Sequence, residues 1–180
     1  MSNKGLLKGL LANYRTSGAI AFSGKSLVNC MVNKVDFDKA KVIVEFGPGN
    51  GCITRELLKR MRPDAVLYAF EVNKFFCDEL NIWNDKRMTV VNDVAQSAAA
   101  HLDGLQPDYI VSALPFGIFS ESLCQEIMES IQQLSLPKTR FVQFSYSPVQ
   151  RKRYSKVFKH IKMDFTLMNI PPAFVFSCHN

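Results

Sequence analysis

The sequence predicts an α/β fold: a seven-stranded, mostly parallel sheet with helices on both faces and an antiparallel hairpin at the carboxyl end. Short β-branched runs alternate with segments of helical length and pattern. The first of these runs leads into a loop with glycine at three alternate positions, a junction typical of nucleotide-type ligand sites. With 180 residues, 47% of them hydrophobic, the chain is long enough for one well-cored domain.

Five apolar runs are expected to form the parallel part of the sheet. They are Val42 to Phe46, Ala65 to Phe70, Met88 to Val91, Tyr109 to Ala113 and Phe141 to Tyr146. Runs of this kind are typical of strands that are buried on both faces, between layers of helices. The first helix after the glycine loop is expected from about Cys52 to Met61.

The last part of the chain is expected to close the sheet with a hairpin. After a short helical segment, Met163 to Asn169 and Ala173 to Ser177 have strand character. Pro171 and Pro172 separate them and would interrupt any ladder of hydrogen bonds. The two runs therefore predict an antiparallel pair with a turn at the prolines.

The positive charge is concentrated in one segment, 151–162. Six cations and no acid occur there, Arg151, Lys152, Arg153, Lys156, Lys159 and Lys162, so they account for the whole net charge of +6. Tyr154, Val157, Phe158 and Ile161 recur at helical spacing, which predicts an amphipathic helix with a basic face. Such a helix suits an anionic membrane surface, RNA phosphates, or plain packing with a solvated face.

Residues 1–36 are expected to form a helical lid or membrane-contact segment ahead of a catalytic domain at 37–180. Leu6, Leu7, Leu10, Leu11 and Tyr14 share one helical face. Lys4, Lys8 and Arg15 lie along its edge, which is typical of a helix in the headgroup region of a bilayer.

The composition predicts a cytoplasmic protein whose membrane contact, if it has any, is peripheral. No apolar run approaches the roughly 18 residues that a membrane span needs, and no signal peptide is apparent. The five cysteines are scattered and the three histidines lack ligand spacing, so we expect reduced thiols and no metal.

The glycine loop narrows the ligand to two cofactor classes. A dinucleotide fingerprint would place its third small residue at Cys52, whereas here the third glycine is Gly51. The chain also has an acid, Glu45, two residues before Gly47. This acid-x-Gly-x-Gly-x-Gly pattern resembles motif I of class I S-adenosylmethionine methyltransferases, which have a Rossmann-like fold.

Three strand-end acids are assigned to the cofactor. Glu71 follows the second strand and can accept both ribose hydroxyls, Asp93 follows the third and can accept from an adenine amino group, and Glu45 can face the methionine ammonium. The full set expected to bind S-adenosylmethionine is Glu45, Gly47, Pro48, Gly49, Gly51, Glu71, Val72, Asp93, Val94 and Ser112.

The methyl acceptor is expected beside the end of the fourth strand. Pro115 stiffens this loop and keeps Leu114 extended, so that carbonyls of residues 112–114 can face an amine. Phe116 would supply an aromatic wall, or would belong to the core in a plain strand-ending turn. The residues assigned to the reaction are Ser112, Ala113, Leu114, Pro115, Phe116 and Tyr146, with Tyr14 as a further candidate to accept the amine proton.

Several motifs together resemble the soluble bacterial phospholipid N-methyltransferases, relatives of the ribosomal RNA adenine dimethylases. They are Leu6, Leu7 and Leu11; Thr16 to Ala21; Glu45 to Gly49; Ser112 to Phe116; Phe141 to Tyr146; and Asn169 to Ala173. The resemblance covers nearly the whole chain. It implies a class I methyltransferase fold, S-adenosylmethionine as donor, and the amine of phosphatidylethanolamine-type lipids as acceptor.

Three other functions stay open. Leu114 to Phe116 also resemble the loop on which adenine N6-methyltransferases stack a base, although Ala113 stands where those enzymes usually have Asn or Asp, and the chain ends without the helical domain by which RNA dimethylases grip RNA. A small-molecule amine could be the acceptor instead. A protein that binds the cofactor without turnover is the third alternative.

Overall fold

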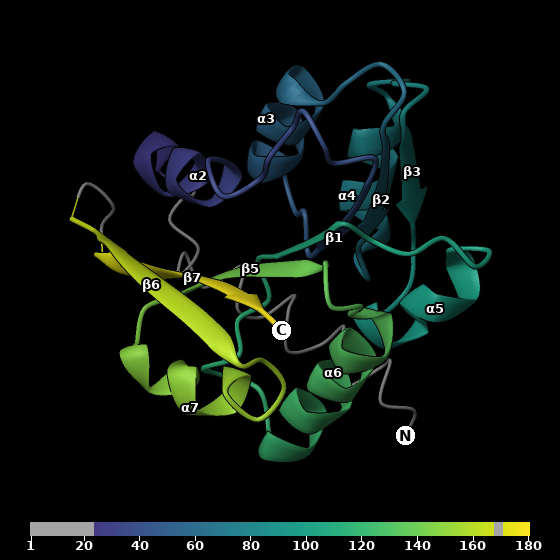
Figure 1. Ribbon diagram of the computed structural model, residues 1–180. Helices are drawn as coiled ribbons and strands as arrows, with labels where there is room; N and C mark the ends of the chain where they lie inside the picture. Colours follow the sequence, from purple (N-terminus) through teal and green to yellow (C-terminus); the bar gives the residue numbers. More distant parts are fainter. Residues whose placement is uncertain (1–23, 168–170) are drawn as a thin grey trace.

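The computed structural model describes residues 24–167 and 171–180 and shows helices packed on both sides of a twisted sheet (Figure 1). Within these residues seven strands pair in the order β3-β2-β1-β4-β5-β7-β6. The strands are β1 (Val42–Phe46), β2 (Val66–Phe70), β3 (Met88–Val91), β4 (Tyr109–Ser112), β5 (Arg140–Ser145), β6 (His160–Thr166) and β7 (Ala173–His179). The first five are parallel, and β7 is antiparallel to both β5 and β6, so the predicted fold class is confirmed.

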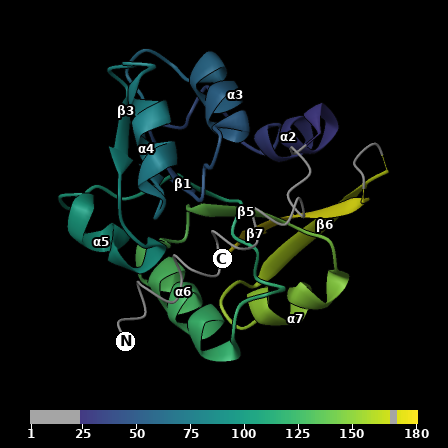
Figure 2. The same cartoon turned by 180° about the vertical axis from the view of Figure 1, so that it is seen from behind.

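The helices fall into two layers, which the view from behind shows from the other side (Figure 2). The described helices are α2 (Lys25–Val32), α3 (Cys52–Arg60), α4 (Lys74–Asn81), α5 (Ala98–His101), α6 (Glu121–Leu134) and α7 (Arg151–Tyr154), with short 3₁₀ helices η1 (Ala95–Ser97) and η2 (Pro148–Gln150). Apolar residues of α2 and α3 share one cluster with Ile43 of β1. Those of α6 and α7 share the other with Val44 and Phe46, as the two-residue period of a strand requires.

The strand predictions agree with the structure to within one residue for β1 to β5. Val42–Phe46 and Met88–Val91 match the predicted runs, and the helix after the glycine loop ends at Arg60 in place of Met61. The hairpin differs from the prediction, because β6 runs from His160 to Thr166 in place of Met163 to Asn169, and β7 continues two residues further, to His179. Pro171 and Pro172 lie between the two strands, as predicted.

The predicted amphipathic helix over 151–162 is wrong. Only α7, Arg151–Tyr154, is helical, and β6 has begun by His160. The four apolar residues do face the core: Phe158 stacks on Phe141 with 5.6 Å between ring centroids, while Ile161 pairs with Cys178 of β7. A turn followed by a strand therefore satisfies the same apolar spacing, and pairing with β7 also satisfies the backbone.

The amino-terminal segment is described only in part. The predicted helical face from Leu6 to Tyr14 lies outside the described residues. The remainder of 1–36 contains α2, whose Leu27 and Met31 are fully buried against the sheet. Lys34 forms an ion pair with Asp164 of β6 at 2.6 Å, so α2 lies over the carboxyl-terminal hairpin. The boundary at residue 36 stays a prediction.

Among the described residues, no helix has the length and apolar character needed to cross a membrane.

Candidate active site

The strand order brings the predicted site residues to one edge of the sheet. The chain passes from β3 back to β4, which pairs with β1 on the side opposite β2. Phe46 is in register with both Phe70 and Ser112, so the loops that follow β1, β2 and β4 start side by side. A change of strand order of this kind is where open α/β sheets bind their ligands.

The glycine loop adopts the left-handed backbone at all three positions, with φ of 73° at Gly47, 58° at Gly49 and 77° at Gly51. A Cβ on Gly51 would lie 2.3 Å from the Trp83 ring, so this glycine is required by packing at the start of α3. A Cβ on Gly47 would lie 3.2 Å from Cδ2 of Leu114. The cofactor loop and the predicted acceptor loop are therefore in close contact.

The Glu71 carboxylate joins the glycine loop to the end of β2. The side chain is 2% exposed, and its two oxygens accept hydrogen bonds from the backbone amides of Gly49 at 3.1 Å and Asn73 at 2.9 Å. A carboxylate has about four acceptor positions, so ribose hydroxyls could still bind it. The position agrees with the role assigned to Glu71, and the role itself stays a prediction.

Glu45 is a fully buried acid at the end of β1. Neither of its carboxylate oxygens has a hydrogen-bond partner of ordinary geometry. The pKa of Glu45 is raised to about 8, mainly by burial; Thr54 of α3 opposes the rise, and the nearby Glu71 charge adds to it. A buried carboxyl without a partner is costly, and a ligand cation placed beside it would offset that cost.

Asp93 follows β3, as expected, and is held by its neighbours. Its Oδ1 accepts a hydrogen bond from the Val94 amide at 2.7 Å, and its Oδ2 lies 3.3 Å from Nε2 of His101. The His101 ring in turn packs edge-on against Phe70, 5.8 Å between centroids. Val72 is buried in the same apolar cluster as Phe70, and Val94 is half-buried against that cluster.

The acceptor loop has a compact set of internal hydrogen bonds. The Ser112 hydroxyl, fully buried, accepts from the Leu114 amide at 3.3 Å. The Leu114 carbonyl accepts from the Phe116 amide and from Nε2 of Gln143, each at 3.0 Å. The Leu114 carbonyl is thus engaged within the protein, which argues against its predicted contact with an amine, and the same contact at residues 112 and 113 stays a prediction.

The aromatic residues assigned to the acceptor differ in their surroundings. Phe116 is 3% exposed and packs against Phe119 and Tyr154, with 6.4 and 6.0 Å between ring centroids. Phe116 was expected either to line the acceptor site or to belong to the core, and the structure places it in the core. Tyr146 is half-buried and packs edge-on against Phe144 at the end of β5. Tyr14 lies outside the described residues.

Two residues near the site escaped the sequence prediction. Gln143 lies in the middle of β5, is fully buried, and has an Oε1 without a partner. His101 ends α5 and contacts Asp93. The lone polar residue inside an apolar strand was a signal for Gln143, whereas nothing in the local pattern distinguished His101.

The described residues suit the cofactor that the motif indicates. The buried Glu45, whose carboxylate oxygens lack hydrogen-bond partners, fits a ligand ammonium, and the left-handed backbone at Gly47, Gly49 and Gly51 fits a loop that approaches a ligand closely. Glu71 and Asp93 follow adjacent strands, β2 and β3. No cluster of three or more His, Cys, Asp or Glu occurs within 24–167 and 171–180, and the five cysteines are unpaired.

Comparisons with known proteins bear on the family and the fold. Residues 22–173 match the family model of the ribosomal RNA adenine dimethylases. The ornithine lipid N-methyltransferase of Singulisphaera acidiphila is 28% identical over 166 residues, which are 89% of this chain and 86% of that protein. Ribosomal RNA small subunit methyltransferase A of Mycoplasmopsis synoviae is 30% identical over 100 residues, 55% of this chain and 37% of that protein.

A solved structure confirms the architecture. Precorrin-6y C5,15-methyltransferase from Geobacter metallireducens superposes with a TM-score of 0.64 at 14% identity, covering 88% of this chain and 92% of that one. Identity at this level shows a shared fold alone.

Proposed function

We propose that this chain, which belongs to the ribosomal RNA adenine dimethylase family, methylates the primary amine of a membrane lipid. The family and the fold make it an S-adenosylmethionine-dependent methyltransferase of class I. The acceptor that we propose is a phospholipid of the phosphatidylethanolamine type, or an amino lipid of related headgroup chemistry.

The chain's own residues would hold the donor as the motif indicates. The backbone of Gly47 to Gly51 would admit the methionine end, with Glu45 near its ammonium, Glu71 at the ribose and Asp93 at the adenine. Bound S-adenosylmethionine supplies an electrophilic methyl group on a sulfonium. The protein then has to orient the amine and to keep it neutral, since a protonated ammonium has no lone pair.

The observation that carries the lipid proposal is the burial of Phe116. A loop that stacks a base must present an aromatic face, but this ring is 3% exposed and is enclosed by Phe119 and Tyr154. Gln143 further fixes Leu114 from the neighbouring strand. A loop of this kind, enclosed by apolar side chains, suits a small neutral amine better than a purine.

The relative that aligns over most of both chains supports the same acceptor class. The Singulisphaera protein is named as an ornithine lipid N-methyltransferase, and its alignment with this chain covers 86% of its length. The matched ribosomal RNA methyltransferase is covered over 37%.

Membrane contact is part of the proposal. Five of the six cations at 151–162 are exposed, and Arg153 pairs with Glu121 at 2.7 Å. The exposed cations and the amino-terminal segment, for which the sequence predicts an amphipathic helix, would bring the protein, from the cytoplasm, to an anionic membrane surface.

Adenine in ribosomal RNA is the second candidate acceptor. The matching family model carries that activity in its name, and the Mycoplasmopsis relative is named as a ribosomal RNA methyltransferase. Gly47 to Gly51, Glu71 and Asp93 would serve either acceptor equally.

The test is to offer both acceptors to the purified protein with methyl-labelled S-adenosylmethionine. We expect label in the lipid from vesicles of phosphatidylethanolamine or of ornithine lipid, and none in ribosomal RNA. Glu71→Ala should abolish labelling, and Glu79→Ala, an exposed acid of α4, should retain it. Label in RNA alone would replace the proposal with the second candidate, and cofactor binding without transfer to any amine would indicate a binder.

A further inference from the structure

The outer face of β6 exposes a row of large apolar side chains. Met163, Phe165 and Leu167 alternate along the strand and just beyond it, and they are 41%, 52% and 73% exposed. We refer to these three residues as the β6 apolar face. Soluble proteins rarely leave such a row uncovered without a binding role.

The opposite side of β6 is already used within the fold. Thr166 is buried and lies 2.9 Å from the Ser26 hydroxyl, and Asp164 pairs with Lys34 at 2.6 Å. Both contacts fix β6 against α2. The β6 apolar face must therefore point to the side of the sheet on which α7 lies, where Ile161, two residues before Met163, packs against the core.

The β6 apolar face lies at the same edge of the sheet as the candidate active site. Phe165 is in register with Phe174, which is in register with Ser145 at the end of β5. The rings of Phe165 and Phe174 are 4.8 Å apart. Since β1, β4 and β5 run parallel, the end of β5 lies at the edge where Ser112 ends β4. Val149 in η2, 67% exposed, follows β5 at that edge.

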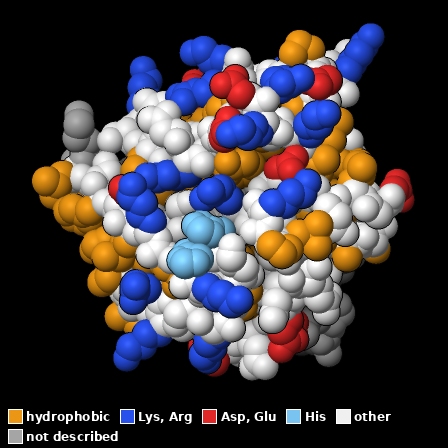
Figure 3. All heavy atoms as spheres, viewed as in Figure 1, with side chains coloured by type: hydrophobic (Ala, Val, Ile, Leu, Met, Phe, Trp, Pro, Cys, Tyr) orange, Lys and Arg blue, Asp and Glu red, His pale blue; other side chains and the backbone are white. Residues whose placement is uncertain are grey.

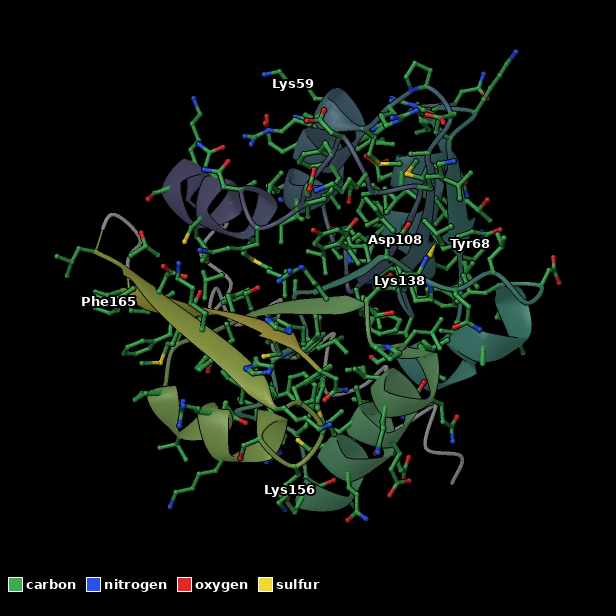
Figure 4. All side chains as sticks on the ribbon, in the orientation of Figure 1. Lys59, Tyr68, Asp108, Lys138, Lys156 and Phe165 are labelled. Atoms are coloured by element: carbon green, nitrogen blue, oxygen red, sulfur yellow. The ribbon has the colours of Figure 1, made fainter. Side chains whose placement is uncertain are left out.

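Cations lie beside this face on the same side of the sheet. Arg151 and Lys152 begin α7, Lys156 follows it, and all three are exposed. No ion pair among the described residues involves them. The space-filling view shows apolar side chains along its left margin with Lys and Arg beside and below them (Figure 3). Figure 4 labels Phe165 at the left and Lys156 at the bottom.

We propose that the β6 apolar face inserts into the interface of an anionic bilayer, so that the active-site edge of the sheet faces the lipid headgroups. Apolar side chains rimmed by cations are the combination that binds such a surface. The inference rests on the proposed lipid acceptor and adds to it the surface and the orientation of docking.

Two other occupants fit less well. A second copy paired edge to edge through β6 would bring the cations of 151–162 toward the same cations of its partner, which is unfavourable. Single-stranded RNA would stack on Phe165, but it gains little from the aliphatic Met163 and Leu167.

The experiment is vesicle co-sedimentation with the full chain. Vesicles contain phosphatidylethanolamine with phosphatidylglycerol, and the variants are Phe165→Gln and Leu167→Gln. We expect each to lower the partition coefficient about tenfold. Leu167→Gln should leave thermal unfolding unchanged, whereas Phe165→Gln also loses the ring contact with Phe174 and should unfold at a slightly lower temperature. The matched control is Ile82→Gln at the end of α4, which is 74% exposed and should bind as the wild type does.

Three outcomes would overturn the inference. They are an unchanged partition coefficient in both variants, an equal loss in Ile82→Gln, or a loss of self-association or of RNA binding in place of vesicle binding. Methyl transfer to detergent-dispersed lipid is measured in parallel. If no lipid amine is methylated but Leu167→Gln still weakens vesicle binding, the proposed acceptor fails and the docking surface stands.

Discussion

Glu45 and Glu71 end neighbouring strands, yet their carboxylates have different surroundings. The Glu71 carboxylate accepts hydrogen bonds from two backbone amides, and these bonds compensate for its burial. Glu45 is buried without any such bond. The hydrogen bonds of Glu71 hold its side chain in place with or without a ligand, whereas Glu45 would be stabilised by a ligand cation beside it.

Glu71→Ala should weaken the binding of S-adenosylmethionine by about ten- to a hundredfold, because charge-assisted bonds to ribose hydroxyls would be lost. Calorimetric titration measures the change. Glu79→Ala serves as the control, since its side chain is exposed on α4. An unchanged affinity in Glu71→Ala would remove the ribose assignment.

Glu45→Gln should stabilise the ligand-free protein increasingly as pH rises. The pKa of Glu45 is about 8 in the folded protein, against an ordinary pKa of 4.5 for a glutamate side chain in water. Between these values the folded state keeps a proton that the unfolded chain has released, so the free energy of unfolding of the wild type falls as pH rises. The Gln side chain cannot ionise and avoids this loss.

Urea unfolding at about pH 5 and about pH 9 tests this prediction, and we expect the variant's advantage to grow by on the order of 4 kcal/mol. Glu79→Gln should show no such trend. An advantage that is the same at both pH values would mean that Glu45 is ionised in the folded protein at neutral pH.

At the scale of elements, the turn from β1 into α3 depends on a glycine for packing. Gly51 starts α3 with a left-handed backbone, and Trp83 occupies the space of a Cβ. Arg55 of the same helix lies over the Trp83 ring, with 5.0 Å from its guanidinium carbon to the centroid. The loop is therefore held by the segment after α4 as well as by its own turn.

Gly51→Ala should lower the free energy of unfolding by on the order of 2–3 kcal/mol, because it combines backbone strain with a steric clash. Chemical denaturation measures the loss. Gly117→Ala is the matched control, since its Cβ would meet nothing within 4 Å. Recovery of part of the stability in Gly51→Ala combined with Trp83→Leu would identify the clash, and no recovery would leave the backbone as the cause.

Over the whole molecule, charge and sheet geometry act together. The formal excess of +6 arises within 151–162, and the structure distributes these residues over α7, a turn and the start of β6. The cations are therefore spread around the carboxyl-terminal hairpin and do not form one helical face. A flat anionic surface suits this distribution better than a narrow groove does.

Reversal of two of these charges, Lys152→Glu with Lys156→Glu, should lower the affinity for anionic vesicles at least tenfold at low ionic strength. Each cation near such a surface contributes about 1 kcal/mol. Wild-type binding should itself weaken as salt is added, since the Debye length is about 10 Å at 0.1 M. Sedimentation with vesicles measures both effects.

Lys59→Glu with Lys86→Glu makes the same change in net charge on α3 and before β3, outside 151–162. Figure 4 labels Lys59 at the top of the molecule, away from Phe165 and Lys156. This control should lose little affinity. Equal losses in the two double variants would mean that only net charge matters, and a wild type that fails to bind at low salt would count against the lipid acceptor.

The sequence predicted correctly those strands and turns whose formation depends on a few consecutive residues. The buried runs at Val42–Phe46 and Met88–Val91, and the glycine loop after the first, are read from a few consecutive residues. The segment 151–162 was predicted wrongly, because apolar spacing of three and four does not distinguish a helix from a turn and a strand. Pairing with β7, which depends on residues distant in sequence, decided between them.

The candidate site shows the same division. The sequence places Glu45, Glu71 and Asp93 within two residues of the end of a strand, and parallel strands end at one edge, so their common location could be predicted. Gln143 was missed because its contact with Leu114 depends on the register of β4 with β5. The burial of Phe116 depends on Tyr154, which a whole helix and strand separate from it in the chain.

The sequence by itself determined the sheet of alternating elements, the cofactor class and the strand-end acids, because these follow from periodicity, glycine placement and charge within short segments. Only the tertiary structure decided that Phe116 is enclosed, that Glu45 lacks a partner and that the β6 apolar face is exposed at the active-site edge. The physical reason is that burial and pairing are properties of what packs against a residue, and those neighbours come from distant parts of the chain.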